Sequence, residues 1–250
     1  MVVLKTKREL DLMREACRIS ANALKLAGQA VEPGVSTKDI DDIVRKYIQG
    51  QGATPSFLGY GGFPASACIS VNNVVIHGIP SKKQILKNGD IVSVDVGAFI
   101  GGFHGDNAFT FACGDISKEA QMLLKATEES LYEGIKQAVA GNRIGDISHA
   151  VQSYAEDRSY SVVRDFVGHG VGAKLHEDPS VPNYGVKGRG VRLLPGMTIA
   201  IEPMITMGDY KVKVLDDDWT TVTVDGSLAA HFEHTVAITP NGPVIMTIPD

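Results

Sequence analysis

The segment VSVDVGAFIGGFHGD (residues 92–106) places Asp95 inside an apolar run and supplies a second carboxylate at Asp106. Gly101 and Gly102 favour a two-residue hairpin turn, because glycine readily adopts the positive φ angles that such turns require. With this turn, Asp95 faces residue 108 and Asp106 faces residue 97. Since side chains alternate along a strand, the two acids then share one face of the hairpin as diagonal neighbours.

The apolar neighbours of these two acids indicate that the hairpin is buried. Burying an unpaired carboxylate is costly, so an acid retained in such a place needs a cation or a proton. Two carboxylates side by side also repel each other unless something positive lies between them. The segment therefore predicts either a metal ion or a shared proton at Asp95 and Asp106.

Composition narrows the class of protein. The chain has 250 residues, of which 44% are hydrophobic and 21% charged, so it can bury a core as one large domain or two modest ones. Its net charge of -5 favours neither nucleic acid nor anionic membranes as partners. It has no apolar run of membrane-spanning length, and its N-terminal segment is too charged for a signal peptide. The odd set of cysteines, Cys17, Cys68 and Cys113, lacks CxxC spacing and suits reduced thiols in the cytoplasm.

Helix and strand signals alternate along the chain. Thr6 with Glu9 and Ser36 with Asp39 have the spacing of capping boxes, which start helices. Further helices are predicted at residues 117–139 and 146–158, strands at about 67–110, and a strand-rich remainder with turns at residues 225–226 and 241–242. This order predicts an α+β protein.

The two halves of the chain resemble each other, and one constant shift in residue number relates the matching positions. The shift carries Gly34, Asp39, Ile40, Val44, Tyr47, Gly89 and Asp95 to Gly141, Asp146, Ile147, Val151, Tyr154, Gly196 and Glu202. Because the shift covers helix and strand alike, we expect two related αβ halves whose acids, Asp95 and Glu202, converge where the halves meet. The segments HGIP, with His77, and HEDP, with His176, form a weaker match between the halves.

The second half adds His169, Glu202 and Glu233 to the two hairpin acids. Each residue alone could be an ordinary core or surface group. Together, four carboxylates and one imidazole form an oxygen-rich set that suits divalent ions such as Mn(II) or Fe(II), and carboxylates can bridge two ions. The chain has no GxSxG, Walker A or HExxH motif, so the corresponding hydrolase, nucleotide and zincin sites are not indicated.

The ordered motifs HGIP, VDVGAFIGGFHGDNAFTF, GHGVGAKLHEDP, GMTIAIEPM and FEHT closely resemble the bacterial type I methionine aminopeptidases over essentially the whole chain. This resemblance implies the pita-bread fold, in which two pseudo-symmetric αβ halves surround an antiparallel β-sheet with helices on its outer face. It implies a single catalytic domain over residues 1–250, with halves of roughly 1–112 and 113–250.

The resemblance also implies the chemistry. The enzyme is expected to remove N-terminal methionine, preferably before a small second residue, through attack on the first peptide bond by a water or hydroxide activated by two divalent ions (Co, Mn, Fe(II) or Zn). Glu202 is expected to manage the proton of this water, while His77 and His176 hydrogen-bond the peptide and stabilise developing charge. The expected metal ligands are Asp95, Asp106, His169, Glu202 and Glu233, with Asp106 and Glu233 bridging the ions.

An apolar slot for the methionine side chain follows from the same family pattern. Two positions depart from that pattern: Phe57 stands where many relatives have Cys, and Leu175 where many have Phe. Both remain apolar, so we expect the selectivity for methionine to survive. The residues expected at the slot are Phe57, Tyr60, Phe63, Cys68, His77, Leu175, His176 and Trp219.

The expected partners are nascent polypeptide N-termini and short Met-peptides, with transient ribosome association, no nucleic acid, no membrane and a monomeric state.

The chain lacks a cysteine-rich N-terminal extension, and the short interval between Glu202 and Glu233 leaves no room for the helical insertion of type II enzymes. Two alternatives remain. Proline-specific peptidases share the fold and ligand pattern but carry a large N-terminal domain, and a non-catalytic module of this fold would not need all five ligands.

Overall fold

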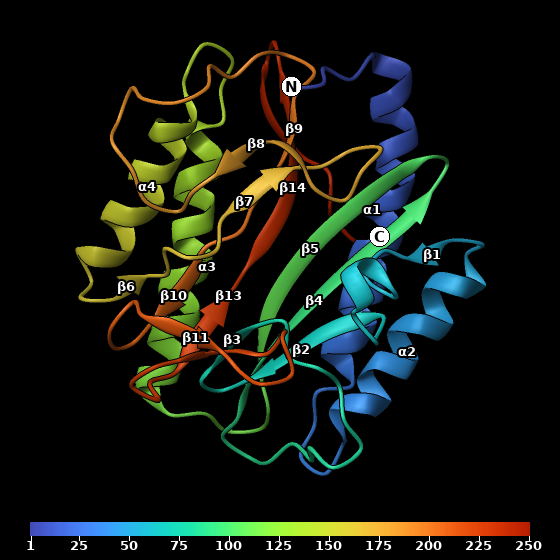
Figure 1. Cartoon of the computed structure of the whole chain (residues 1–250), viewed down its shortest axis with the longest axis vertical. Coiled ribbons are helices and arrows are strands. Elements are labelled where there is room, and N and C mark those ends of the chain that lie inside the picture. Colours follow the sequence, from blue (N-terminus) through green and yellow to red (C-terminus); the bar gives the residue numbers. More distant parts are fainter.

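An antiparallel sheet of nine strands runs through the centre of the computed structural model, which describes residues 1–250 (Figure 1). Its strands follow the order β1-β4-β5-β14-β9-β7-β8, with β2 paired to β4 and β15 to β14. Their bounds are β1 Thr54–Pro55, β2 Ala67–Val71, β4 Ile91–Ile100, β5 Phe103–Ala112, β7 Gly168–Gly170, β8 Glu177–Val181, β9 Thr198–Ile201, β14 Glu233–Thr239 and β15 Gly242–Ile245.

Two small sheets and four helices complete the molecule. One small sheet has the order β13-β10-β6 and the other β11-β12-β3. Their strands are β3 Val74–Ile76, β6 Ser161–Val162, β10 Met204–Thr206, β11 Val212–Val214, β12 Thr221–Thr223 and β13 Ala229–His231. The helices are α1 Lys7–Gln29, α2 Thr37–Gly50, α3 Lys118–Gln137 and α4 Ile144–Glu156, and a 3-10 turn spans Tyr60–Gly62. The α+β architecture with an antiparallel sheet, predicted from the sequence, is confirmed.

The helices begin where the capping signals indicate, with one exception. Capping boxes at Thr6 and Ser36 start α1 and α2, and the Ser117 hydroxyl caps α3, so these three starts are confirmed. Helix α4 begins at Ile144, slightly before the predicted start at residue 146. The carboxylate of Asp146 accepts a hydrogen bond of 2.7 Å from the Arg143 N–H, so this acid stabilises the first turn from within the helix.

The β4–β5 hairpin has the predicted register. Asp95 pairs with Ala108 and Asp106 with Gly97, and the turn residues Gly101 and Gly102 have φ angles of 62° and 86°. A glycine pair with positive φ is required by the turn type that suits the twist of two antiparallel strands. The two acids therefore lie diagonally on one face of the hairpin.

The internal repeat of the sequence recurs in the backbone. Isolated bridges join Ser36 to Ile85 and Arg143 to Arg192, and the shift that relates the two halves carries the first pair onto the second. The glycines Gly34, Gly89, Gly141 and Gly196, which the same shift relates, all have φ between 92° and 100°. Helices α1 and α2 lie at the right of the view and α3 and α4 at the left (Figure 1). The division into halves at residues 1–112 and 113–250 within a single domain stays a prediction.

Each helix pair covers its own apolar core. The larger core packs α3 and α4 against β9 and β14 and includes Leu123, Ile147 and Ile199. The other packs α1 and α2 against β2 and β4 and includes Ile19 and Ile40. Because both cores lie on the helix-covered side of the sheet, the opposite side is left for the buried acids. None of the helices combines the length and apolar character that a membrane span needs.

Gly105, beside Asp106 in β5, allows α1 to approach the sheet closely. A Cβ atom at this position would lie 2.4 Å from the backbone N of Cys17 and 2.5 Å from its Cα. Overpacking of this kind typically costs about 1–3 kcal/mol. We expect Gly105→Ala to lower the free energy of unfolding by at least that amount in urea denaturation. Gly50→Ala is the control, because nothing lies within 4 Å of its added Cβ. Equal stability of the two variants would contradict this account of helix packing.

Candidate active site

One cavity collects all thirteen residues that the sequence places at the site. Its volume is about 150 Å³, comparable to an engineered cavity that holds one benzene molecule. This size suits a single side chain better than a large ligand. The lining residues are Phe57, Tyr60, Phe63, Cys68, His77, Asp95, Asp106, His169, Leu175, His176, Glu202, Trp219 and Glu233.

The five predicted metal ligands come from five neighbouring strands. In the order of the sheet, Asp95 lies on β4, Asp106 on β5, Glu233 at the start of β14, Glu202 directly after β9 and His169 on β7. Strand β14 stands between β5 and β9 and so joins the first half of the chain to the second. The ligand row therefore crosses the junction between the halves.

The ligand atoms converge closely. One ligand atom from each of Asp106, His169 and Glu233 lies within 4.8 Å of the other two. The Nε2 atom of His169 is 3.5 Å from Oε1 of Glu202 and 3.8 Å from Oδ2 of Asp106. These separations are too long for hydrogen bonds but leave room for a small ion between the groups.

Several carboxylate oxygens of this group lack the partners that buried polar atoms normally have. Oδ1 of Asp95, Oδ1 of Asp106 and Oε1 of Glu233 are buried and have no hydrogen-bond partner in the protein. Buried polar atoms almost always have partners, and buried carboxylates are paired or bind metals. Divalent ions would satisfy the unpaired oxygens and relieve the repulsion between the acids, so the residues present fit a metal site.

Burial makes the charged forms of these groups unfavourable. It raises the pKa of Asp106 to about 7, and burial together with neighbouring carboxylates raises the pKa values of Asp95, Glu202 and Glu233 well above their ordinary range. Burial lowers the pKa of His169 to about 4, so its imidazole is neutral at pH 7. A neutral imidazole is the form that binds a metal.

Metal loading is therefore expected to release protons. Asp106, whose pKa is about 7, holds a proton in a large fraction of molecules at pH 7, whereas metal binding requires the carboxylate form. We expect Mn(II) titrated into metal-free protein at pH 7 to give a calorimetric enthalpy that depends on the ionisation enthalpy of the buffer. The number of protons released should fall as the pH rises. An enthalpy independent of the buffer at pH 7 would contradict the prediction.

The apolar end of the cavity forms a slot beside the acids. Phe57, Phe63, Cys68 and Leu175 are buried together in one cluster, and Trp219 packs against it with its ring centroid 5.1 Å from that of Phe63. Burial raises the pKa of the Cys68 thiol far above its ordinary value, so the thiolate needed for a nucleophile is disfavoured. Cys68 thus contributes surface to the slot.

Three residues line the route between the slot and the ligands. Tyr60 is 45% exposed at the mouth, and its hydroxyl lies 2.7 Å from Nδ1 of His176. The His176 ring lies edge-on to His169, with 4.3 Å between their centroids. His77 has a φ angle of 58°, and burial lowers its pKa to about 4. Burial also lowers the pKa of His176, so the rings of His77 and His176 are both neutral at pH 7.

His231 is absent from the set predicted from the sequence, although it lies against the ligands. It is buried, and its Nε2 atom has no hydrogen-bond partner and lies 3.6 Å from Oε2 of Glu202. The Nδ2 atom of Asn183 donates to the Glu202 carbonyl and holds the backbone there. The only signal in the sequence is its closeness to a predicted ligand, because His231 ends β13 two residues before Glu233 begins β14.

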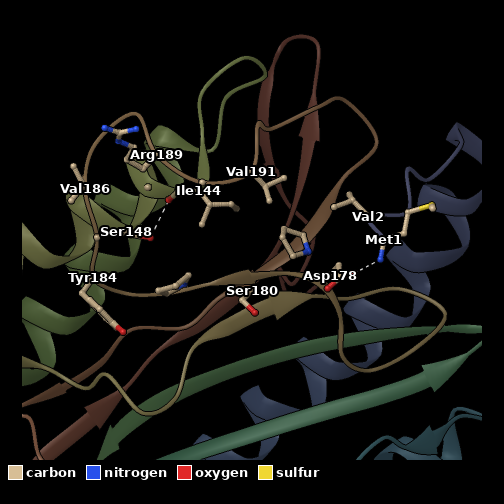
Figure 2. A pocket seen from close by; sticks show the side chains of 15 residues that line it. Met1, Val2, Ile144, Ser148, Asp178, Ser180, Tyr184, Val186, Arg189 and Val191 are labelled. Carbon is tan, nitrogen blue, oxygen red and sulfur yellow. Dashed lines mark hydrogen bonds and ion pairs between the residues drawn. The ribbon is translucent and has the colours of Figure 1, made fainter.

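A second pocket on the surface has a larger volume, about 510 Å³, but none of the thirteen residues line it (Figure 2). It lies between the start of α4, the segment around Arg189 and the N-terminal residues. Its lining is mostly apolar and lacks a group of converging acids or histidines. The chemistry-bearing groups are therefore concentrated in the smaller cavity.

Comparison with known proteins gives consistent results. The model of metallopeptidase family M24 matches residues 11–240. The methionine aminopeptidase of Clostridium perfringens is 56% identical over 248 residues, which cover 99% of both chains. Methionine aminopeptidase 1 of Bacillus subtilis is 53% identical over 247 residues, also covering 99% of both chains.

The solved structures that resemble this chain fall into two groups. The crystal structure of methionine aminopeptidase from Thermotoga maritima has a TM-score of 0.97 and 46% identity, and the match covers 99% of both chains. Prolidase from Pyrococcus furiosus has a TM-score of 0.80 and 23% identity, and the match covers 99% of this chain but 66% of the prolidase. The second likeness shows a shared fold and no more.

Proposed function

This chain belongs to metallopeptidase family M24, and we infer from this that it is a methionine aminopeptidase with the pita-bread fold. It removes N-terminal methionine from proteins and peptides, preferably when the second residue is small. The observation that carries this function is that the five predicted ligands on neighbouring strands and an apolar slot for one side chain share a single cavity of about 150 Å³. Relatives at 53% to 56% identity over the full chain bear the same name.

Asp95, Asp106, His169, Glu202 and Glu233 hold two divalent ions in this proposal. Asp106 and Glu233 would be the two ligands shared by the ions, which is supported by their lying on adjacent strands, β5 and β14, within the ligand row. Divalent ions in such a site supply a water that is deprotonated near neutral pH. Among Co, Mn, Fe(II) and Zn, the oxygen-rich ligand set favours Mn or Fe(II).

Glu202 and the two cavity histidines act on the peptide bond. The Glu202 carboxylate, which lies beside His169 and His231, would take a proton from the attacking water and return it to the leaving amine. His77 and His176 are neutral, so each can donate a hydrogen bond from its ring to the scissile carbonyl as negative charge develops. His231, beside Glu202, lies where it can restrain that carboxylate.

The slot and the acids together select the end of the substrate. The cluster of Phe57, Phe63 and Leu175 accepts one unbranched apolar side chain. The free α-amine of a chain terminus would bind divalent ions held by the adjacent acids through its nitrogen lone pair, which an internal amide nitrogen does not offer. Met at the first position of a free N-terminus meets both requirements.

Hydrolysis of Met-Ala-Ser, compared with an Xaa-Pro peptide, tests the proposed function. We expect release of methionine from Met-Ala-Ser in the presence of Mn(II), no release from the Xaa-Pro peptide, and loss of activity with a chelator. Preferred cleavage of the Xaa-Pro peptide would indicate a proline-specific peptidase. No cleavage of either peptide with added metal would indicate a binding module without activity.

The cellular setting is also part of the proposal. The three cysteines are buried free thiols, which supports a reducing compartment, the cytoplasm, where nascent chains are available. Transient association with the ribosome and a monomeric state remain predictions.

A further inference from the structure

A buried ion pair joins the N-terminal segment to the first residue of β8. The Nζ atom of Lys5 lies 2.6 Å from Oε2 of Glu177, and the two side chains are only 3% and 8% exposed. Every other pair between Lys or Arg and an acidic side chain has at least one member that is more than a quarter exposed. Burying two charges is costly, so this pair needs an explanation beyond ordinary surface electrostatics.

Both members of the pair are held by further hydrogen bonds. The backbone N–H of Lys5 donates to the carbonyl of Gly196 at 2.7 Å, and its Nζ atom also donates to the Val3 carbonyl at 3.3 Å. The second carboxylate oxygen of Glu177, Oε1, accepts the backbone N–H of Lys174 at 3.1 Å. The carboxylate therefore closes a loop, residues 172–177, and the lysine anchors that loop to the neighbouring backbone.

The other end of loop 172–177 is packed against the same pair. A Cβ atom on Gly172 would lie 2.5 Å from Cε of Lys5 and 2.7 Å from Oε1 of Glu177. The carbonyl of Gly172 accepts the His104 N–H at 2.8 Å, which fixes it to β5. The ion pair thus touches both ends of the loop.

Between these ends, loop 172–177 carries two residues of the cavity. Leu175 is 3% exposed within the cluster that forms the slot, and His176 faces the ligands beside His169. Neither residue has a strand pairing of its own, because β8 begins only at Glu177. Their positions therefore depend on how the loop is held.

We propose that Lys5, acting through Glu177, is a positioning residue that sets both the methionine slot and the histidine that contacts the peptide. The inference rests on the proposed function. Removing either charge leaves the other buried without a partner, which is strongly unfavourable. The loop then relaxes toward solvent and carries Leu175 and His176 with it.

Lys5→Met and Glu177→Gln test the proposal, with Lys136→Met as the matched control in an exposed pair with Glu133. Glu177→Gln is nearly isosteric, so it remains informative if Lys5→Met folds poorly. We expect each to lower kcat/KM for Met-Ala-Ser by about 10²-fold, since a displacement of about 1 Å can have this effect. Discrimination between Met-Ala-Ser and Leu-Ala-Ser should also weaken. The kcat/KM of the double variant should be no lower than that of the more impaired single variant, because both substitutions remove the same ion pair.

Hydrogen exchange of the metal-free proteins provides a readout that does not depend on activity. Amides of residues 172–177 should exchange faster in Lys5→Met and Glu177→Gln than in wild type and in Lys136→Met. A variant with a lower melting temperature but unchanged exchange, kcat/KM and Met-to-Leu discrimination would overturn the proposal. If wild type fails to cleave Met-Ala-Ser, the proposed function fails, and loop exchange alone decides whether the pair holds the loop.

Discussion

Glu233→Gln is expected to lower kcat/KM for Met-Ala-Ser by roughly 10³-fold or more, because divalent ions supply several kcal/mol of stabilisation and each ~1.36 kcal/mol is tenfold. Glu233 lies in the middle of the ligand row, beside Asp106 and near Glu202. A neutral amide there is expected to weaken the affinity for divalent ions. Mn(II) binding, measured by calorimetry, should fall in parallel with activity.

The same substitution is expected to leave the metal-free protein at least as stable as wild type at pH 8. Burial and neighbouring carboxylates raise the pKa of Glu233 in the folded state far above its ordinary value of 4.5. For an acid with a raised pKa, folding loses stability as the pH rises above the unfolded value, because only the unfolded chain ionises readily. Glutamine does not titrate, so its advantage over wild type should grow from pH 5 to pH 8 in thermal unfolding.

Glu156→Gln is the control for this prediction, because Glu156 is exposed on α4. It should alter neither activity nor the pH dependence of stability. Retention of kcat/KM within tenfold of wild type by Glu233→Gln at saturating Mn(II) would contradict the bridging role. A marked loss of metal-free stability at pH 8 would contradict the electrostatic account.

His176→Ala is expected to reduce kcat by about 10²–10³-fold, the effect typical of losing one donor to a developing oxyanion. Its ring is neutral near pH 7, because burial lowers its pKa, and the Tyr60 hydroxyl lies 2.7 Å from Nδ1. This contact leaves Nε2 free for the peptide. KM should change less than kcat, since the interaction strengthens as charge develops.

Steady-state kinetics of His176→Ala, His77→Ala and the exposed control His149→Ala measure this effect. The first two should show the loss in kcat, and the control should behave as wild type. A higher KM with unchanged kcat in His176→Ala would show that the ring binds substrate without stabilising the transition state.

Much of this site can be predicted from local sequence signals. The glycine pair at residues 101–102 determines the hairpin register, so the shared face of Asp95 and Asp106 follows from turn geometry and strand alternation. Capping residues determine where α1, α2 and α3 begin. His231 shows the limit of such signals, since a lone histidine in an apolar strand gives no indication that Glu202, far away in sequence, lies 3.6 Å from it.

The sequence by itself therefore determines the starts of α1, α2 and α3, the β4–β5 register, the internal repeat and the identity of the acids, because each depends on residues that are close together in the chain or on its self-similarity. Only the tertiary structure decides that β14 lies between β5 and β9, and that Lys5 meets Glu177. The order of strands and the contacts between distant segments result from burying two apolar cores on one side of a single sheet, and no local periodicity encodes that arrangement.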